Sequence, residues 1–160
     1  MAQIKAFIIT VSDTRTLEND ISGDRLAELL INFGTEVTGK MVVSDNLDDV
    51  KNTIYVLTER DDVNLILTTG GTGFGPRDNT PEATRAVIER EAPGIAEAMR
   101  RETSVKTPLA MLSRGICGIR GDTLIVNLPG SPKGVEECFE VIGPVLGHAI
   151  LMLAGETKHE

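Results

Sequence analysis

Stretches rich in Val, Ile and Leu alternate along this chain with stretches whose apolar residues recur every three or four positions. Residues 4–11, 35–43 and 63–69 have the first pattern and predict strands, and the first of them is apolar enough to be buried on both faces of a parallel sheet. Residues 22–33 and 47–60 have the second pattern and predict amphipathic helices. This alternation predicts an α/β domain in which crossover helices cover both faces of a mostly parallel sheet.

The second half of the chain is expected to add two helices, a hairpin and a long terminal helix. One helix is predicted at residues 81–90, and a further short helix follows a break at residues 93–94. Residues 112–128 change to short apolar runs around a glycine turn, which predicts a hairpin. The apolar face of residues 135–153 predicts a terminal helix that covers the sheet and is interrupted at Gly143-Pro144.

Composition narrows what this chain can do. The 160 residues are 41% hydrophobic but only 3% aromatic, so base stacking is not an expected mode of binding. A net charge of -8 argues against binding to nucleic acid or to an anionic membrane. Cys117 and Cys138 are too far apart for a zinc or redox motif, and no signal peptide precedes the first strand, so the expected location is the cytoplasm. Residues 1–160 contain no repeat or linker and are expected to form a single domain.

The most informative stretch is residues 65–81, which reads Leu-Ile-Leu-Thr-Thr-Gly-Gly-Thr-Gly-Phe-Gly-Pro-Arg-Asp-Asn-Thr-Pro. It predicts a strand, a glycine loop and a helix start, and glycine lets backbone N–H groups approach an anion, so the loop is a candidate phosphate or carboxylate cradle. It is not a dinucleotide fingerprint, because Pro76 stands where the last glycine is required, and it is not a P-loop, because no Lys-Ser or Lys-Thr pair follows Gly75. The alternative is a glycine turn that only lets a strand pack closely on a helix. If the cradle is real, valine at Gly71 or Gly73 is expected to weaken nucleotide binding and to leave folding largely intact.

Polar residues follow the predicted strands at residues 12–13, at Asp45, at the glycine loop with Asp78, and at residues 127–131. Because the carboxyl ends of parallel strands meet at one edge of a sheet, these polar ends are expected to lie together, although loops can also be polar only because they face water. Asp45 and Asp78 follow consecutive strands. Two carboxylates beside a triphosphate need a hard cation between them, which predicts a Mg²⁺ site at Asp45 and Asp78 rather than a general base.

Three motifs together resemble the signatures of the molybdopterin adenylyltransferases. They are residues 69–84, Leu-Ser-Arg-Gly at residues 112–115, and Asn-Leu-Pro-Gly-Ser-Pro-Lys at residues 127–133. The G domains of gephyrin and of the plant molybdenum-insertion protein share this fold family, and the resemblance covers nearly the whole chain. It implies transfer of AMP from ATP to molybdopterin with Mg²⁺ and release of pyrophosphate. It also implies a homo-trimer or hexamer, with the molybdenum-insertion protein as a further partner.

The resemblance assigns roles to individual residues. Asp45 and Asp78 match the catalytic and metal-binding aspartates. The nucleotide-binding positions it implies are Gly70, Gly71, Thr72, Gly73, Pro129 and Gly130. The substrate-binding positions it implies are Ser12, Asp20, Ser22, Ser113, Asn127 and Ser131.

The chain departs from part of the family in two ways. It lacks an insertion that some bacterial adenylyltransferases carry before the final helix, and its compact first loop resembles a sister branch in which some members have lost the acidic pair and the activity. Both aspartates are present here, which favours an active enzyme. A non-catalytic molybdopterin-binding carrier or scaffold is the alternative, and it would not need Asp45 and Asp78 together. An unrelated nucleotide-binding regulator is a second alternative, and it would not require the pterin.

Overall fold

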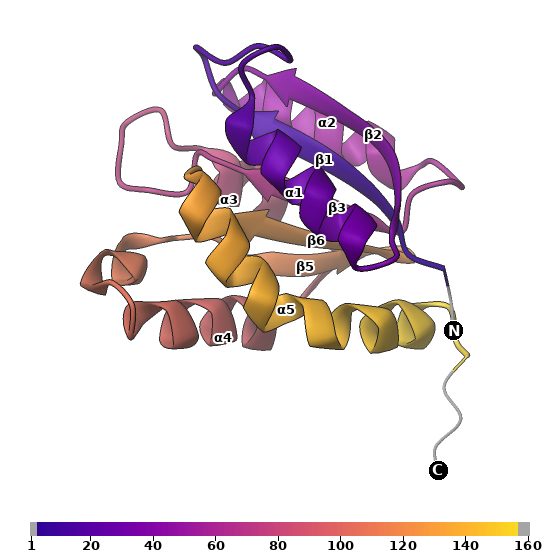
Figure 1. The fold of residues 1–160 in the computed structure, drawn as a ribbon. Helices are drawn as coiled ribbons and strands as arrows, with labels where there is room; N and C mark the ends of the chain where they lie inside the picture. The colour runs from indigo at the N-terminus through magenta and orange to yellow at the C-terminus, as the bar shows by residue number, and fades with distance from the viewer. Residues whose placement is uncertain (1–2, 157–160) are drawn as a thin grey trace.

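The computed structural model describes residues 3–156, which form one six-stranded sheet with helices on both faces (Figure 1). The strands are β1 (Lys5–Val11), β2 (Glu36–Val43), β3 (Leu65–Thr69), β4 (Arg90–Glu91), β5 (Cys117–Arg120) and β6 (Thr123–Leu128). The helices are α1 (Ile21–Asn32), α2 (Leu47–Thr58), α3 (Thr80–Arg85), α4 (Pro93–Ser104) and α5 (Pro132–Leu153), with a short 3₁₀ helix η1 (Pro108–Leu112).

The order of strands in the sheet is β2-β1-β3-β6-β5-β4. β2, β1, β3 and β6 are parallel to one another, whereas β5 and β4 are antiparallel to their neighbours. β5 and β6 form the predicted hairpin. The predicted α/β class, with a mostly parallel sheet, helices on both faces and a short hairpin, is therefore confirmed.

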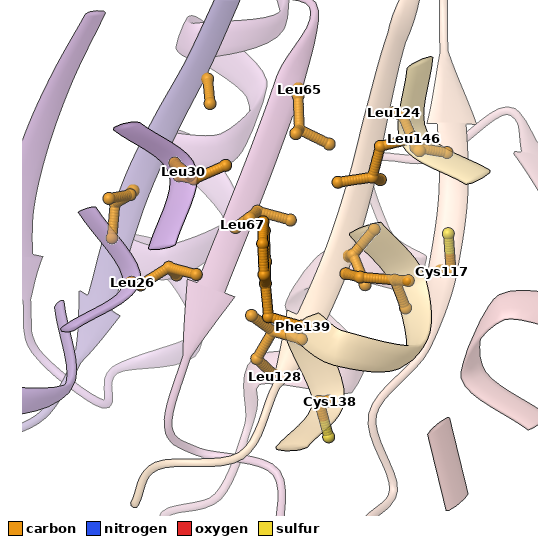
Figure 2. Close-up of a cluster of buried hydrophobic side chains, with 14 of the residues drawn as sticks. Leu26, Leu30, Leu65, Leu67, Cys117, Leu124, Leu128, Cys138, Phe139 and Leu146 are labelled. Carbon is orange, nitrogen blue, oxygen red and sulfur yellow. The ribbon is translucent and has the colours of Figure 1, made fainter. Parts of the chain in front are cut away.

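Alternate residues of the central strands face two separate cores. On one face, Leu65 and Leu67 of β3 pack with α1, α4 and α5, and on the other face Ile66 packs with α2 and α3. Figure 2 shows the first of these clusters, in which Leu30 of α1 and Phe139 of α5 lie over β3. All of β3 is buried, which explains why a central parallel strand reads as a continuous apolar run.

Both cysteines belong to this first core. Cys117 on β5 and Cys138 on α5 are free thiols (Figure 2). Burial raises the pKa of the Cys117 thiol to about 12 and that of the Cys138 thiol to about 11. Both thiols therefore stay protonated near neutral pH and act as small apolar side chains.

Two predicted helix boundaries are wrong. α3 ends at Arg85, and residues 90–91, which were predicted to be helical, pair with β5 as the edge strand β4. α4 is not a short helix after a break but has 12 residues and begins at Pro93. Proline fits the first turn of a helix, where its missing N–H would have no intrahelical acceptor. Pro93 therefore starts α4 instead of breaking the chain before it.

The terminal helix α5 runs without interruption through its 22 residues, although Pro144 lies inside it. A proline inside a helix removes one hydrogen bond and crowds the preceding turn. The ribbon of α5 changes direction partway along its length (Figure 1), so the predicted interruption is a bend. Among residues 3–156, neither α5 nor any other helix has the length and hydropathy needed to span a membrane.

Candidate functional site

The polar ends of the parallel strands meet at one edge of the sheet, as predicted. After β1, the backbone N of Asp13 donates to Asp45 Oδ2, which follows β2 (2.9 Å), and Asp45 N donates in return to Asp13 Oδ1 (3.0 Å). After β3, Gly70 N donates to the carbonyl of Leu128 at the end of β6 (3.2 Å). The loops after the strands are therefore joined in pairs along this edge.

The carbonyl groups of the glycine loop accept hydrogen bonds from Thr80 and Arg114. Thr80 donates to the carbonyls of Gly70 and Gly71 through its Oγ1 (2.9 Å) and its backbone N (3.1 Å). Arg114 donates to the next two carbonyls through its backbone N and its Nε (2.8 Å each). By contrast, the N–H groups of residues 71–74 have no acceptor within residues 3–156. Successive unpaired amides of this kind form an anion-binding nest.

The chain's own packing also requires glycine in this loop. Gly70 and Gly71 have φ angles of 99° and 68°, which side chains with a Cβ rarely adopt. A Cβ on Gly70 would lie 2.5 Å from the carbonyl oxygen of Val11, and one on Gly71 would collide with the Thr80 hydroxyl. The expectation that valine at position 71 leaves folding intact is therefore wrong. Gly73 differs, because its φ is not positive and an added Cβ would meet only a side chain.

Asp45 and Asp78 follow β2 and β3, which are consecutive strands along the chain but are not neighbours in the sheet. β1 lies between β2 and β3 in the sheet, so the loop that begins at residues 12–13 separates the two aspartates. Asn79, the residue after Asp78, links the two loops, because its Nδ2 donates to the backbone carbonyl of Asp45 (3.1 Å). Asp78 Oδ2 accepts a hydrogen bond from Gly75 N (2.8 Å), so its side chain folds back onto the glycine loop.

Asp13, which the sequence places only among the polar strand ends, joins these loops. Arg77 donates to it in a bidentate manner, from Nε to Oδ2 (2.6 Å) and from Nη2 to Oδ1 (3.0 Å). The Arg77 guanidinium holds the pKa of the Asp13 carboxyl below its ordinary value. Burial has the opposite effect on Asp45 and raises its pKa. Arg77 thus offsets part of the negative charge that the two carboxylates bring to the edge.

The two aspartates fit Mg²⁺ only together with a ligand from the substrate. Among residues 3–156, no group of three or more His, Cys, Asp or Glu side chains could hold a metal ion. Asp45 and Asp78 each keep one carboxylate oxygen, Oδ1, that accepts no hydrogen bond from the described part of the chain. Mg²⁺ is commonly bound by one or two carboxylates, with substrate phosphates and water as the other ligands. Each aspartate thus has one carboxylate oxygen available for a metal ion that arrives with a phosphate group.

A cavity of about 510 Å³ opens beside the glycine loop, a volume typical of small-molecule sites. Its lining includes nine residues predicted from the sequence: Gly71, Thr72, Gly73, Asp78, Ser113, Asn127, Pro129, Gly130 and Ser131. A second part of the lining was not predicted and comes from α4, η1 and α5: Ala96, Met99, Leu109, Ala110, Leu112 and Cys138. Polar loops combined with an apolar wall suit a ligand that carries both a phosphate and a flat ring.

Residues 129–131 form a second turn at the cavity. Thr69 Oγ1 donates to the Pro129 carbonyl (2.7 Å), and Ser22 Oγ donates to the Gly130 carbonyl (2.6 Å). The N–H groups of Gly130 and Ser131 have no acceptor in the described part of the chain. Ser131 also caps α5, whose N-terminus therefore lies at the cavity. The partial positive charge of a helix N-terminus favours a phosphate there.

Asp20 and Ser12 lie outside the cavity. Asp20 is 1% exposed and accepts hydrogen bonds from Thr10 Oγ1 (2.7 Å) and Gly23 N (2.9 Å), so it caps α1 and leaves little surface for a ligand. Ser12 Oγ accepts from the backbone N of residues 14 and 15 (3.2 and 3.1 Å). Ser12 also lines a second hollow of about 420 Å³ between the loop after β1 and the end of β2.

Asn127 and Ser113 both line the cavity but differ in what they offer a ligand. Asn127 is 1% exposed, and its Nδ2 donates to the hydroxyls of Thr68 (3.0 Å) and Thr84 (2.9 Å). Its amide hydrogens are therefore used to fix the end of β6. Ser113 Oγ accepts from Gly115 N (3.3 Å) and donates to no group within residues 3–156. The Ser113 hydroxyl is the better candidate for direct contact.

Two arginines that the sequence pattern did not single out hold the loops around the cavity. Arg114, besides its contacts with the glycine loop, pairs with Glu82 and holds the pKa of that carboxyl below its ordinary value. Arg100 Nη1 donates to the carbonyls of Ser113 (3.3 Å) and Gly115 (2.7 Å). Arg114 stands in the Leu-Ser-Arg-Gly motif, so the motif was a usable signal. Arg100 has no such signal, because the docking of α4 decides where it points.

Comparison with known proteins gives a consistent family. A family model described as "Probable molybdopterin binding domain" matches residues 7–148. The molybdopterin adenylyltransferase of Helicobacter pylori is 34% identical over 164 residues, which covers 97% of this chain and 90% of that protein. The molybdenum cofactor synthesis protein cinnamon of Drosophila melanogaster is 42% identical over 99% of this chain, but the chain spans only 27% of its length.

Solved structures agree with these sequence relatives. The molybdopterin biosynthesis enzyme MoaB of Thermus thermophilus has a TM-score of 0.88 at 44% identity, covering 96% of this chain and 98% of that one. The molybdopterin biosynthesis Mog protein of Mycobacterium ulcerans has a TM-score of 0.87 at 41% identity, covering 96% and 99% of the two chains.

Proposed function

The chain belongs to the family of molybdenum cofactor biosynthesis proteins that contains the molybdopterin adenylyltransferases, and on this basis we propose that it is such an enzyme. In this proposal residues 1–160 act as one catalytic domain in the cytoplasm. The substrates are ATP and molybdopterin, Mg²⁺ is required, and the product passes to the molybdenum-insertion protein.

The proposed reaction is the transfer of an adenylyl group. An oxygen of the terminal phosphate of molybdopterin attacks the α-phosphorus of ATP and forms a new P–O bond. The bond from the α-phosphorus to the oxygen that bridges it to the β-phosphorus breaks, and pyrophosphate leaves with the electron pair. Adenylylated molybdopterin remains. Catalysis of such a step rests mainly on positioning and on neutralising charge at the phosphoryl oxygens.

The observation that carries this proposal is the set of unpaired N–H groups at residues 71–74 beside the cavity. We assign the phosphates of the nucleotide to Gly70–Gly73 and to Pro129 and Gly130 of the second turn. Asp45 and Asp78 would hold Mg²⁺, which when bound neutralises phosphate charge and fixes the phosphates in place. Ser113 would donate its hydroxyl to the substrate.

Two sites at one edge match a reaction with two substrates. The hollow beside Ser12 lies over β1 and β2, and the cavity lies over β3 and β6. Asp13 lines the hollow, Asp78 lines the cavity, and Arg77, which pairs with Asp13, precedes Asp78 in the chain. We infer that each site receives one substrate, so that the phosphate of molybdopterin meets the α-phosphate of ATP beside the aspartates.

Incubation of the purified protein with ATP, Mg²⁺ and molybdopterin tests the proposal. Adenylylated molybdopterin and pyrophosphate are expected in equal amounts, and omission of any component or addition of EDTA should stop their formation. A carrier or scaffold would bind the pterin and yield no product. A nucleotide-binding regulator of another kind would bind ATP and leave the pterin unbound.

We also propose that the chain forms a homo-trimer or hexamer. Most of the apolar stripe of α5 packs on the chain's own sheet. Large exposed apolar side chains remain on α5, at Val145 and Met152, and others occur after α4 and in η1, at Val105, Leu109 and Met111. Such surface is commonly covered by a partner. Sedimentation at micromolar concentration should give the mass of three or six chains, and a monomer would contradict this proposal.

A further inference from the structure

Glu137 lies in the wall of the cavity and has no part in the function proposed above. It stands on α5, one turn beyond Lys133, and its side chain is 12% exposed. Lys133 Nζ lies 3.9 Å from the Glu137 carboxylate, at the limit of an ion pair, and is itself 84% exposed. Within residues 3–156, the carboxylate of Glu137 accepts no hydrogen bond. A carboxylate this far removed from water usually has donors.

Within residues 3–156, no Lys or Arg of the cavity lining forms an ion pair with Glu137. Arg100 is the only Lys or Arg in the described lining, and its Nη1 is committed to two backbone carbonyls. Among residues 3–156, the side-chain oxygens and nitrogens that are both inaccessible to solvent and without a hydrogen-bond partner are Thr35 Oγ1 and Arg120 Nε. The oxygens of Glu137 are not in this set although they have no partner, so they still reach the water of the cavity. A ligand with N–H groups would replace that water and compensate the charge.

An ionised carboxylate only accepts hydrogen bonds, so its ligand must donate them. The apolar side chains that share the cavity, such as Met99 and Leu109, favour a flat ring over a second polar group. Both substrates of the proposed reaction carry an exocyclic amino group on a fused nitrogen heterocycle, adenine at C6 and the pterin at C2.

We propose that Glu137 recognises the exocyclic amino group of the heterocycle bound in this cavity and so selects the substrate by its ring. The inference rests on the proposed function for the identity of the two heterocycles. It adds to the phosphate-binding residues one residue that determines which ring is bound. The phosphate contacts alone would admit any nucleotide.

Binding measurements on Glu137→Ala and Glu137→Gln test this inference. Calorimetry is done with ATP alone and with molybdopterin alone, so no turnover is needed. The dissociation constant of the ligand in the cavity should rise about tenfold or more in Glu137→Ala, the scale of a lost hydrogen bond to a charged group. Glu137→Gln keeps one acceptor oxygen and should show a smaller rise. Glu140→Gln is the matched control, because Glu140 lies on the same helix, is 61% exposed and pairs with Lys106.

A nucleotide without the amino group provides the second readout. If adenine is the recognised ring, the wild type binds ATP about tenfold more tightly than purine riboside triphosphate, and Glu137→Ala binds the two equally. A loss confined to molybdopterin assigns the contact to the pterin amino group and contradicts the placement of ATP in this cavity. Either result supports the inference. Unchanged affinity for both ligands in Glu137→Ala overturns it, and so does an equal loss in Glu140→Gln.

Thermal stability separates recognition from a structural role. A structural Glu137 would lower the Tm when replaced, whereas removal of an uncompensated carboxylate should leave the Tm unchanged or raise it. The outcomes also separate this inference from the proposed activity. Glu137-dependent binding without adenylyl transfer would refute only the activity, and transfer with Glu137-independent affinities would refute only the inference.

Discussion

Replacement of Asp45 or Asp78 by asparagine is expected to lower the rate of adenylyl transfer about 10²-fold or more, while the affinity for molybdopterin changes little. Each substitution removes one negative charge from the proposed Mg²⁺ site and keeps the shape of the side chain. Losses of this size follow when a preorganised electrostatic contact to a transition state is removed. The contacts of the pterin ring are expected to lie elsewhere along the edge, which is why its binding should survive.

The geometry explains why asparagine is a suitable probe at both positions. Asp45 Oδ2 accepts from Asp13 N, and Asp78 Oδ2 accepts from Gly75 N. An asparagine oxygen can keep either hydrogen bond, while its NH₂ group takes the place of Oδ1, the oxygen available for the metal. Asp62→Asn is the matched control, because Asp62 is an exposed carboxylate bound by Arg60 in the turn before β3, away from the edge that carries the site.

Initial rates and pterin affinities of the two single variants and the double variant complete this test. If Asp45 and Asp78 serve one ion, the double variant should lose less than the product of the two single losses. The scaffold alternative predicts no turnover in the wild type and normal pterin binding in all three variants. Substantial turnover in the double variant would contradict the assignment of these aspartates.

The elements that could be predicted from the sequence are those whose pattern is local. β3 and its glycine loop are recognisable because a buried apolar run ends abruptly in glycines, and α1 because Asp20 caps a clear amphipathic face. The end of α3 was missed because two residues at positions 90–91 form a strand only through their pairing with β5. The residues close to positions 90–91 in the sequence do not reveal this pairing.

The site was predicted as an edge of the sheet but not as a cavity. Chain order shows that Asp45 and Asp78 follow consecutive strands, but the crossover connections put β1 and Asp13 between those strands. Arg100 and Glu137 were missed because the docking of α4 and α5 on the sheet decides which helical residues face the cavity. A sequence motif thus predicts where a residue lies in the fold better than it predicts which groups that residue contacts.

The second large effect is expected in the glycine loop, where Gly70→Ala should destabilise the fold by about 3 kcal/mol or more. Gly70 has a φ of 99°, and an added Cβ would lie 2.5 Å from the carbonyl oxygen of Val11. That oxygen belongs to the backbone of the last residue of β1, which is paired with Val43 of β2, so moving it away would disturb the sheet. The free energy of unfolding from urea denaturation measures the loss.

Gly34→Ala separates backbone strain from this collision. Gly34 also has a positive φ, 84°, but no atom lies within 4 Å of an added Cβ, so only the left-handed backbone is penalised, at about 1–2 kcal/mol.

Gly73→Ala completes the series, because its Cβ would lie 2.9 Å from Asp78 Oδ2, a side-chain atom that can rotate away. That variant should fold with a small loss of stability and bind ATP more weakly, since the contact between Asp78 and Gly75 is disturbed. If Gly70→Ala and Gly34→Ala lost equal free energy of unfolding, the close approach of β1 would not be the reason that position 70 requires glycine. Unchanged ATP affinity in Gly73→Ala would count against the assignment of this loop to the phosphates.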